Sequence, residues 1–202
     1  MDCGYLEYED DFCLMTFSEN FLLIASTGLC VERLFLRHLE IYSDPSVLVL
    51  VVGTNQQDQD YFCECVRKRG CAEPKRLTGA AGTGDRHLIY LEGGVQFVTT
   101  NILVNDLLSE RLPTNLVTAV LFYRAHIVVR SALEAFVLRT IRQKNQQCLV
   151  KAFSDDPRTF CESFGQLQRA ATMLQVEKVR FMPRFQAEVR YANFVPPLFS
   201  FQ

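Results

Sequence analysis

The sequence predicts an α/β fold with a doubly wound, mostly parallel sheet flanked by helices. Two observations predict it. Short apolar runs rich in β-formers alternate with longer segments whose apolar residues recur at helical spacing. In the run at 117–122 five of the six residues are apolar, as expected of a central strand that is buried on both faces. This alternation implies right-handed crossovers between parallel strands.

The elements follow in order along the chain. An acidic and apolar segment at 6–17 predicts a short helix, and the glycine-rich stretch at 78–84 predicts a mobile loop. Strands are expected at 21–25, 47–52, 88–91, 95–99, 117–122, 148–153 and 176–182. Further helices are expected at 31–41, 58–69, 102–108, after residue 126, and from Pro157 to Leu174, with Ser154 or an Asp as the cap of the last one.

Length and composition indicate one domain. The chain has 202 residues, of which 49% are hydrophobic and 22% charged, enough for one full core. We expect this domain to cover 1–190 and a divergent tail to cover 191–202. The longest apolar run, 47–52, is far shorter than the roughly 18 residues that a membrane span needs. The acidic amino terminus does not resemble a secretory signal, so the eight cysteines favour a reducing compartment.

The turn after the strand at 21–25 lies where P-loop proteins bind phosphate. Thr27 and Gly28 precede the helix, but Val31 and Glu32 stand where a P-loop carries its Lys and its Ser or Thr. An apolar side chain cannot neutralise phosphate, and a carboxylate repels it. A simple turn before a helix explains Thr27 and Gly28 by themselves.

The central strand is followed by Tyr123, Arg124, Ala125 and His126, at the edge where open α/β sheets bind ligands. Helicase-type ATPases carry Asp-Glu-Ala-His there, and the two carboxylates hold Mg²⁺ and orient the attacking water. Tyr123 and Arg124 can do neither. His126 keeps the position, but a hydrogen-bonded histidine at a strand end is an equally good interpretation.

These motifs and their flanks resemble the XPF (xeroderma pigmentosum group F) family of DNA-repair endonucleases, in the first half of its inactive helicase-like region. The resemblance runs from about Leu6 to Arg190 and is weaker between Gln56 and His87. The matching segments are Gly93-Gly94-Val95, Thr100 to Asp106, Arg111-Leu112-Pro113, Tyr123 to His126, Glu134-Ala135-Phe136, Arg142 to Asn145 and Lys151-Ala152-Phe153.

The resemblance implies a degenerate RecA-like first lobe of a superfamily 2 helicase fold, without ATPase activity, that binds DNA and repair proteins. The family cuts DNA near junctions of single and double strands, in nucleotide-excision and crosslink repair, and this implies a nuclear location. Its nuclease domain, which uses Mg²⁺, and the region that binds its small non-catalytic subunit have no match here. We therefore expect a truncated chain with no catalytic site and no cofactor.

Charge is distributed unevenly. Between 111 and 151 there are seven basic residues and one acidic residue, whereas 1–20 holds six acidic residues and no basic one. Backbone phosphates need only Lys and Arg on one face. The DNA-binding candidates are Arg139 and Arg142, which share a helical face, together with Arg111, Arg124, Arg130, Lys144 and Lys151. A merely solvated face is the alternative. The apolar stripe of the same helix, Leu133, Phe136, Val137 and Ile141, is expected to face the core.

Two other functions stay open. An NTPase with unorthodox residues would have to hold its metal through Glu32, and a protein-interaction scaffold would fit the acidic amino terminus. Zinc binding by Cys63, Cys65, Cys71 and His87 lacks the second close pair that structural sites show, so no metal site is predicted.

Overall fold

The computed structural model describes residues 4–77 and 85–182. Its centre is one seven-stranded sheet in the order β3-β4-β2-β5-β6-β1-β7, and each neighbouring pair is parallel. The strands are β1 Phe21–Ala25, β2 Leu48–Val52, β3 Lys75–Arg76, β4 Gly94–Phe97, β5 Val117–Phe122, β6 Leu149–Ser154 and β7 Lys178–Met182. The doubly wound parallel sheet predicted from the sequence is confirmed.

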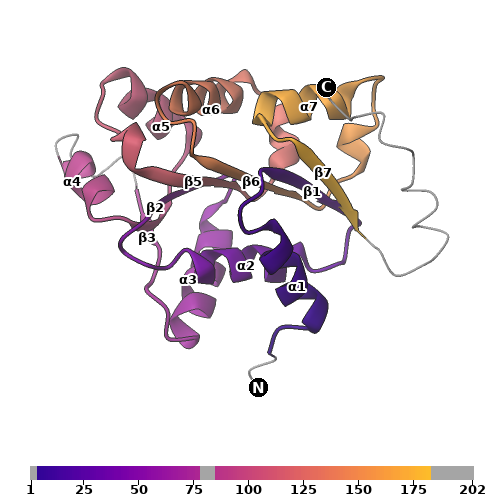
Figure 1. Ribbon diagram of the computed structural model, residues 1–202, viewed down its shortest axis with the longest axis horizontal. Helices are drawn as coiled ribbons and strands as arrows, with labels where there is room; N and C mark the ends of the chain where they lie inside the picture. The colour runs from indigo at the N-terminus through magenta and orange to yellow at the C-terminus, as the bar shows by residue number, and fades with distance from the viewer. Residues whose placement is uncertain (1–3, 78–84, 183–202) are drawn as a thin grey trace.

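Helices cover both faces of the sheet (Figure 1). The α-helices are α1 Glu7–Thr16, α2 Val31–Ile41, α3 Gln56–Lys68, α4 Asp85–Leu91, α5 Thr100–Leu108, α6 Ala132–Lys144 and α7 Gln166–Leu174. Short 3₁₀ turns are η1 Thr114–Leu116, η2 Ala125–Val129 and η3 Arg158–Phe160. Helices α1, α2 and α3 pack on one face, and the later helices pack on the other.

Two hydrophobic cores separate the sheet from its helices. Strands β1, β2 and β5 send alternate side chains into each core: Leu22, Leu50 and Val120 face α5, α6 and α7, whereas Leu23, Val51 and Leu121 face α2 and α3. This two-sided burial explains why the strands appear in the sequence as almost continuous apolar runs. No helix in the described ranges is long and apolar enough to cross a membrane.

The segment predicted as a strand at 88–91 is helical, and it forms the end of α4. A four-residue apolar run does not distinguish strand from helix. Arg86 and Tyr90 lie one turn apart and both contact the buried carboxylate of Asp106, at 3.1 Å and 2.9 Å. Helical spacing brings the two side chains onto one face, so this polar contact favours the helix over the strand.

The helix predicted from Pro157 to Leu174 is also wrong in its first half. Asp156 accepts hydrogen bonds from the backbone of Arg158 and Thr159, which produces only the short turn η3. Gly165, with a φ of +73°, then starts α7. The two-residue strand β3 was not predicted, and the predictions of a mobile loop at 78–84 and a tail at 191–202 lie outside the described residues.

Gly93 permits the tight turn into β4. Its φ is +65°, and a Cβ at this position would lie 2.1 Å from the carbonyl oxygen of Pro45. Any side chain here would therefore push the start of β4 away from the loop that precedes β2.

His38 on α2 is completely buried among aromatic rings. Its Nδ1 lies 2.8 Å from the Leu34 carbonyl, while its ring packs against Phe12, Phe21 and Phe153. Burial lowers the pKa of His38 from 6.5 to about 3, despite the hydrogen bond to Leu34. The folded chain therefore keeps this imidazole neutral.

We predict that His38 makes the fold sensitive to acid. As pH falls below 6.5, His38 binds a proton in the unfolded chain, whereas in the folded chain it stays neutral down to about pH 3. The free energy of unfolding therefore declines by about 1.4 kcal/mol per pH unit in this range. Urea unfolding of the wild type and His38→Leu at pH 7.5 and pH 5.5 measures this. The variant should lose about 1.4 kcal/mol less between the two pH values. Equal losses would contradict the prediction.

Candidate functional site

The candidate site lies at the carboxyl edge of the sheet, where the predicted motifs leave neighbouring strands. Strands β1 and β5 both pair with β6, so the turn after β1 and the segment after β5 are separated by one strand. Thr27 of the first turn donates a hydrogen bond to the Asp155 carbonyl, just beyond β6, at 3.1 Å. The fold therefore brings the two motifs to one edge of the sheet.

The turn after β1 offers no cationic side chain to a phosphate. Gly28 and Cys30 have φ values of +92° and +50°, which turn the backbone into α2. Val31, at the position of the P-loop lysine, is buried in the core under α2. Glu32 follows it, half-buried. The turn thus keeps the shape of a strand-to-helix connection but presents an apolar and an acidic side chain.

Tyr123 is part of the hydrophobic core. Its ring centroid lies 4.9 Å from that of Phe35 and 5.1 Å from that of Phe62, which joins the end of β5 to α2 and α3. Desolvation by this burial raises the pKa of the phenol well above its ordinary value of 10. A neutral phenol in an aromatic cluster cannot replace a metal-binding carboxylate.

Arg124 is held by an ion pair within the chain. Both of its terminal nitrogens donate to the carboxylate of Asp58 at the start of α3, and its Nη2 lies 3.0 Å from Oδ1. This hydrogen bond is the main reason why the pKa of Arg124 is raised. Asp58 also accepts from the backbone of Asn55, whose side chain in turn caps α3. One carboxylate therefore joins β5 to α3 and completes the helix cap.

Gly53 lets these segments approach each other. It ends β2 with a φ of +84°, and a Cβ would lie 3.1 Å from the backbone nitrogen of Arg124. A larger residue would therefore separate the end of β2 from the segment that carries Arg124.

His126 contacts Ser154, the last residue of β6. Its Nδ1 lies 3.0 Å from Oγ of Ser154, which also accepts from the Asp156 backbone. Desolvation is the largest cause that lowers the pKa of His126, and the nearby Asp155 and Asp156 act in the opposite direction. Ser154 therefore links the ends of β5 and β6, whereas Asp156 caps the following turn.

A cavity of about 280 Å³ opens at this edge, between the ends of β2, β4 and β5. Val52, Val98, Phe122 and Val128 give it apolar walls. Its polar lining comes from the Gly53 to Asn55 turn, Thr99, Thr100, Arg124 and Glu134. Oε1 of Glu134 accepts a hydrogen bond of 3.0 Å from the Thr100 hydroxyl.

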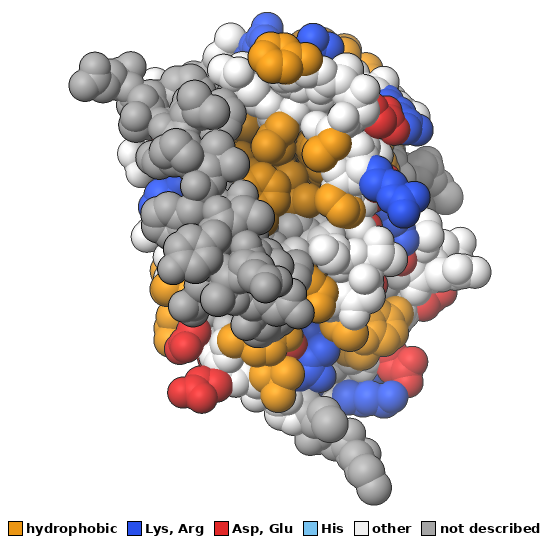
Figure 2. All heavy atoms as spheres, turned by 90° about the vertical axis from the view of Figure 1, so that its right-hand side faces the viewer, with side chains coloured by type: hydrophobic (Ala, Val, Ile, Leu, Met, Phe, Trp, Pro, Cys, Tyr) orange, Lys and Arg blue, Asp and Glu red, His pale blue; other side chains and the backbone are white. Residues whose placement is uncertain are grey.

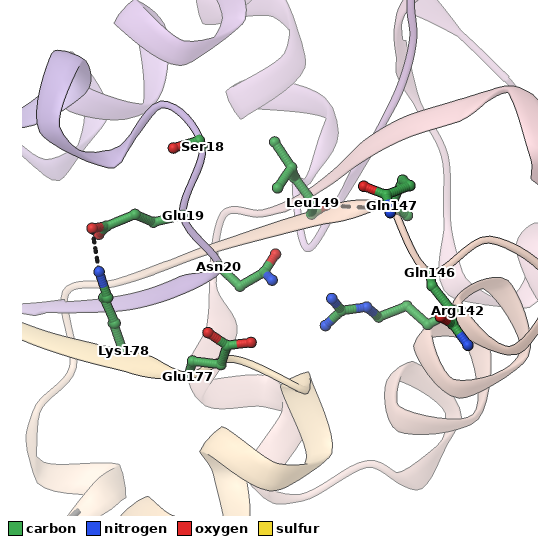
Figure 3. Close-up of a pocket in the computed structure, with 10 residues that line it drawn as sticks. Ser18, Glu19, Asn20, Arg142, Gln146, Gln147, Leu149, Glu177 and Lys178 are labelled. Carbon is green, nitrogen blue, oxygen red and sulfur yellow. Dashed lines mark hydrogen bonds and ion pairs between the residues drawn. The ribbon is translucent and has the colours of Figure 1, made fainter. Parts of the chain in front are cut away.

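A larger cavity, of about 440 Å³, lies at the opposite edge, where β1, β6 and β7 begin (Figure 3). Arg142 projects into it from the end of α6, and its Nη1 donates to the Gln175 carbonyl at 2.6 Å. Glu19 pairs there with Lys178. The Arg142 guanidinium thus already has a hydrogen-bond partner within the chain, whereas Arg139 on the same helical face is exposed.

The predicted basic residues differ in their access to a ligand. Arg130 and Lys144 form surface pairs with Glu162 and Glu110, at 3.2 Å and 3.6 Å. Such exposed pairs contribute little and exchange readily for other anions. Arg111 lies 3.9 Å from the buried Asp106.

Lys151 is fully buried, and its ammonium donates to the carbonyls of Thr16, Phe17 and Glu19 at the end of α1. This corrects the proposal that Lys151 contacts DNA, because phosphate cannot reach it.

The expected core stripe of α6 is partly wrong as well. Val137 and Ile141 are buried, as is Leu138, which was not in the stripe. Leu133 and Phe136 are 46% and 40% exposed, because α6 packs against α5 and α7 through the neighbouring face. The cysteines at 63, 65 and 71 do not form a metal site with His87, whose Nδ1 lies 2.7 Å from the Arg111 carbonyl. No group of three metal-ligating side chains occurs among the described residues.

The chain is similar to known DNA repair endonucleases over most of its own length. The DNA repair endonuclease XPF of Cricetulus griseus is 36% identical over 185 residues, which cover 91% of this chain and 20% of that protein. The XPF of Drosophila melanogaster is 37% identical over 186 residues, 92% of this chain and 19% of that protein. The chain belongs to the XPF family. It spans about one fifth of the length of these XPF relatives.

The DNA repair protein rad16 of Schizosaccharomyces pombe is 30% identical over 187 residues, 91% of this chain and 21% of that protein. The crystal structure of the Pyrococcus furiosus Hef helicase domain superposes with a TM-score of 0.74 and 19% identity, covering 91% of this chain and 39% of that one. This likeness confirms the RecA-like helicase fold. No protein-family model matches the chain. The XPF relatives thus identify a DNA repair endonuclease family member with a helicase-like fold.

Sequence reasoning missed Asp58 and Glu134 as members of this edge. Asp58 lies 66 positions from Arg124, and Glu134 lies 34 positions from Thr100. The pairing of Asn55 with an acidic residue three positions later was a visible capping signal, but it gave no indication of Arg124.

We predict that Arg124 and Asp58 stabilise the fold as a unit. Arg124→Ala and Asp58→Ala should each lower the free energy of unfolding by about 1.5–3 kcal/mol, because each leaves a partly buried charge without its partner. The double variant should lose clearly less than the sum. Urea unfolding of the four proteins gives the coupling energy, expected at about 1 kcal/mol or more. If the losses of the two single variants simply add in the double variant, the interaction between Arg124 and Asp58 does not stabilise the fold.

Proposed function

We propose that this chain is a helicase-like, non-ATPase module of an XPF-type structure-specific endonuclease, which engages DNA and repair proteins. The observation that carries the proposal is the ion pair of Arg124 with Asp58, together with the buried Val31. At these two positions an ATPase needs a water-orienting carboxylate and a phosphate-binding lysine. The chain uses both positions to stabilise its own fold.

The physical cost to catalysis is large. Phosphoryl transfer depends on charges placed around the phosphates and Mg²⁺, and each such contact normally supplies several kcal/mol of transition-state stabilisation. Tyr123 and Arg124 remove two acidic groups, and Val31 removes a cation. Glu32 would then be the sole acidic group at these motif positions. For this reason we favour a binding module over an NTPase with unorthodox residues.

DNA is the ligand that the family suggests. Its relatives are named DNA repair endonucleases, and we propose that this chain contributes to recognising junctions of single and double strands in the nucleus. Phosphate contacts are assigned to the exposed Arg139, with Arg130 and Lys144 able to exchange their surface partners. The small non-catalytic subunit of the family would bind a different region of the longer protein.

Exposed apolar side chains support a role in protein binding. Leu14, Met15 and Phe17 lie at the end of α1, and Phe181 lies on the edge strand β7. Figure 2 shows hydrophobic side chains gathered on the side of the molecule that carries α1, β7 and α7. A repair protein is the partner that we propose, and a scaffold that does not bind DNA is the alternative.

We predict that the purified chain does not hydrolyse ATP. With Mg-ATP, phosphate release should stay at background both with and without forked DNA, because the charges that act on phosphate and metal are absent. The control is Arg124→Ala, which releases the Asp58 carboxylate but supplies no cation for the phosphates and should be equally inactive. Phosphate release above background by the wild type would refute the proposal in favour of an NTPase.

We also predict that Arg139 contributes to DNA binding through charge alone. Arg139→Ala should reduce the slope of log affinity against log salt by about 0.7–0.9, the value for one phosphate contact. The matched control is Arg67→Ala, which removes an exposed arginine from α3 on the opposite face of the sheet. Forked DNA is titrated at several salt concentrations, with circular dichroism to check folding. An unchanged slope would assign Arg139 to solvent or to a protein partner.

A further inference from the structure

Strand β7 forms one edge of the sheet, and among the described residues it pairs only with β1 (Figure 1). The Lys178 amide donates to the Asn20 carbonyl at 3.3 Å, and the Met182 carbonyl also bonds to the turn that follows β1. Alternate residues of a strand direct their backbone groups to opposite sides, so Val179 and Phe181 direct theirs outward. The outer side of β7 therefore offers two amide donors and two carbonyl acceptors to a further strand.

In the part of the chain that the structure describes, this edge lacks the usual protection. Native sheets protect their edges with very short strands, prolines or outward charges. The opposite edge follows this rule, because β3 has two residues, whereas β7 has five. The cations of β7 are Lys178 and Arg180, and both donate to the Glu19 carboxylate, on the face where Met182 packs. These charges are thus drawn toward one face of the sheet and away from the backbone edge.

The two faces of β7 differ in their chemistry. Val179 packs against the core below α7, and Phe181 on the same face is 38% exposed. On the opposite face Lys178 and Arg180 share the single carboxylate of Glu19, so one positive charge remains in excess. A strand added here would therefore meet apolar side chains on one face and a positive charge on the other.

The charges favour a partner protein over a second copy of this chain. Antiparallel pairing of two copies about the middle of β7 would set Arg180 opposite the same arginine of the other copy, and like charges that face each other destabilise a sheet. Glu177 does not compensate, because Figure 3 shows its carboxylate directed into the cavity while Lys178 reaches Glu19. An acidic side chain on the added strand would balance the excess charge.

We infer that β7 accepts an extended segment of a partner protein as an eighth strand, in which acidic side chains opposite the two cations alternate with apolar side chains beside Val179 and Phe181. Main-chain hydrogen bonds supply the affinity of such strand addition, and the alternating side chains supply its selectivity. The inference rests on the proposed protein-binding function and deepens it, because it assigns the binding mode and the chemistry of the partner.

The test uses two labelled peptides, Thr-Val-Glu-Val-Glu-Val-Thr and the same sequence with Lys in place of Glu, and fluorescence anisotropy on the full chain. The acidic peptide should bind about tenfold more tightly, because each of its carboxylates meets a cation where the other peptide brings a like charge. On binding, amide hydrogen exchange should slow at Val179 and Phe181, whose amides face outward. Exchange should stay unchanged at Arg180, which already pairs with β1.

Three variants separate the backbone from the side chains. Phe181→Pro removes one outward amide but keeps the pairing to β1, because an edge strand tolerates proline where its nitrogen faces away from the neighbouring strand. It should abolish binding of the acidic peptide. The matched control, Phe181→Ala, removes the ring but keeps the amide, and should weaken binding by no more than about threefold. Lys178→Gln removes one cation and should reduce the preference for the acidic peptide about threefold.

The outcomes separate this inference from the proposed function. If neither peptide binds, or if both bind equally, the inference is overturned. Binding that persists in folded Phe181→Pro, or that leaves exchange at Val179 unchanged, also overturns it, and protein binding is then assigned to another surface. A wild-type dimer that becomes monomeric in Phe181→Pro and binds no peptide would replace the partner by a second copy.

Should Phe181→Pro not fold, as judged by circular dichroism, the exchange rates of the wild type and the peptide preference of Lys178→Gln decide. Phosphate release and forked-DNA binding by the same preparation test the proposed function independently of this edge.

Discussion

The ion pair between Arg124 and Asp58 determines what the carboxyl edge of the sheet can do. It joins the end of β5 to the start of α3 and leaves the Asp58 carboxylate fully used by Arg124 and the Asn55 backbone. In an ATPase this edge must hold acidic groups ready for a metal and a nucleophile. Here the same space contains a neutralised pair, and the aromatic packing of Tyr123 fills the adjoining position. The residues at these two positions thus stabilise the fold through an ion pair and through aromatic packing.

The strands that matter most were predictable because they are buried on both faces. The runs at 21–25, 47–52 and 117–122 are almost continuously apolar, and this pattern indicates a buried strand without information from the rest of the fold. The prediction of a strand at 88–91 was wrong because the helix there depends on Asp106, a buried acceptor that local periodicity does not reveal. The predicted start of the last helix was wrong for a similar reason. The Asp156 side chain accepts hydrogen bonds from the backbone of Arg158 and Thr159, and a short turn forms there in place of the expected helix.

The position of the candidate site in the fold was predictable from the sequence, but the contacts within the site were not. Sequence motifs located the edge through Thr27, Gly28 and the segment after β5, because strand ends in a parallel sheet meet at one edge. They did not locate Asp58 or Glu134, whose partners lie far away in the sequence. Charge counting suggested Lys151 as a DNA ligand, although its apolar neighbours in β6 indicated a buried position. Net charge along the chain describes neither burial nor pairing.

The buried ammonium of Lys151 has a consequence for the amino-terminal helix. Lys151 lies in β6, yet its hydrogen bonds reach the carbonyls of Thr16, Phe17 and Glu19, where α1 ends. Removing the residues up to Phe17 would take away two of these three acceptors and leave the Lys151 ammonium beside the Phe21 ring, 5.2 Å from its centroid. The first helix is therefore an integral part of the fold, and a shortened protein that begins after Phe17 would keep the Lys151 ammonium with only the Glu19 carbonyl of these three acceptors.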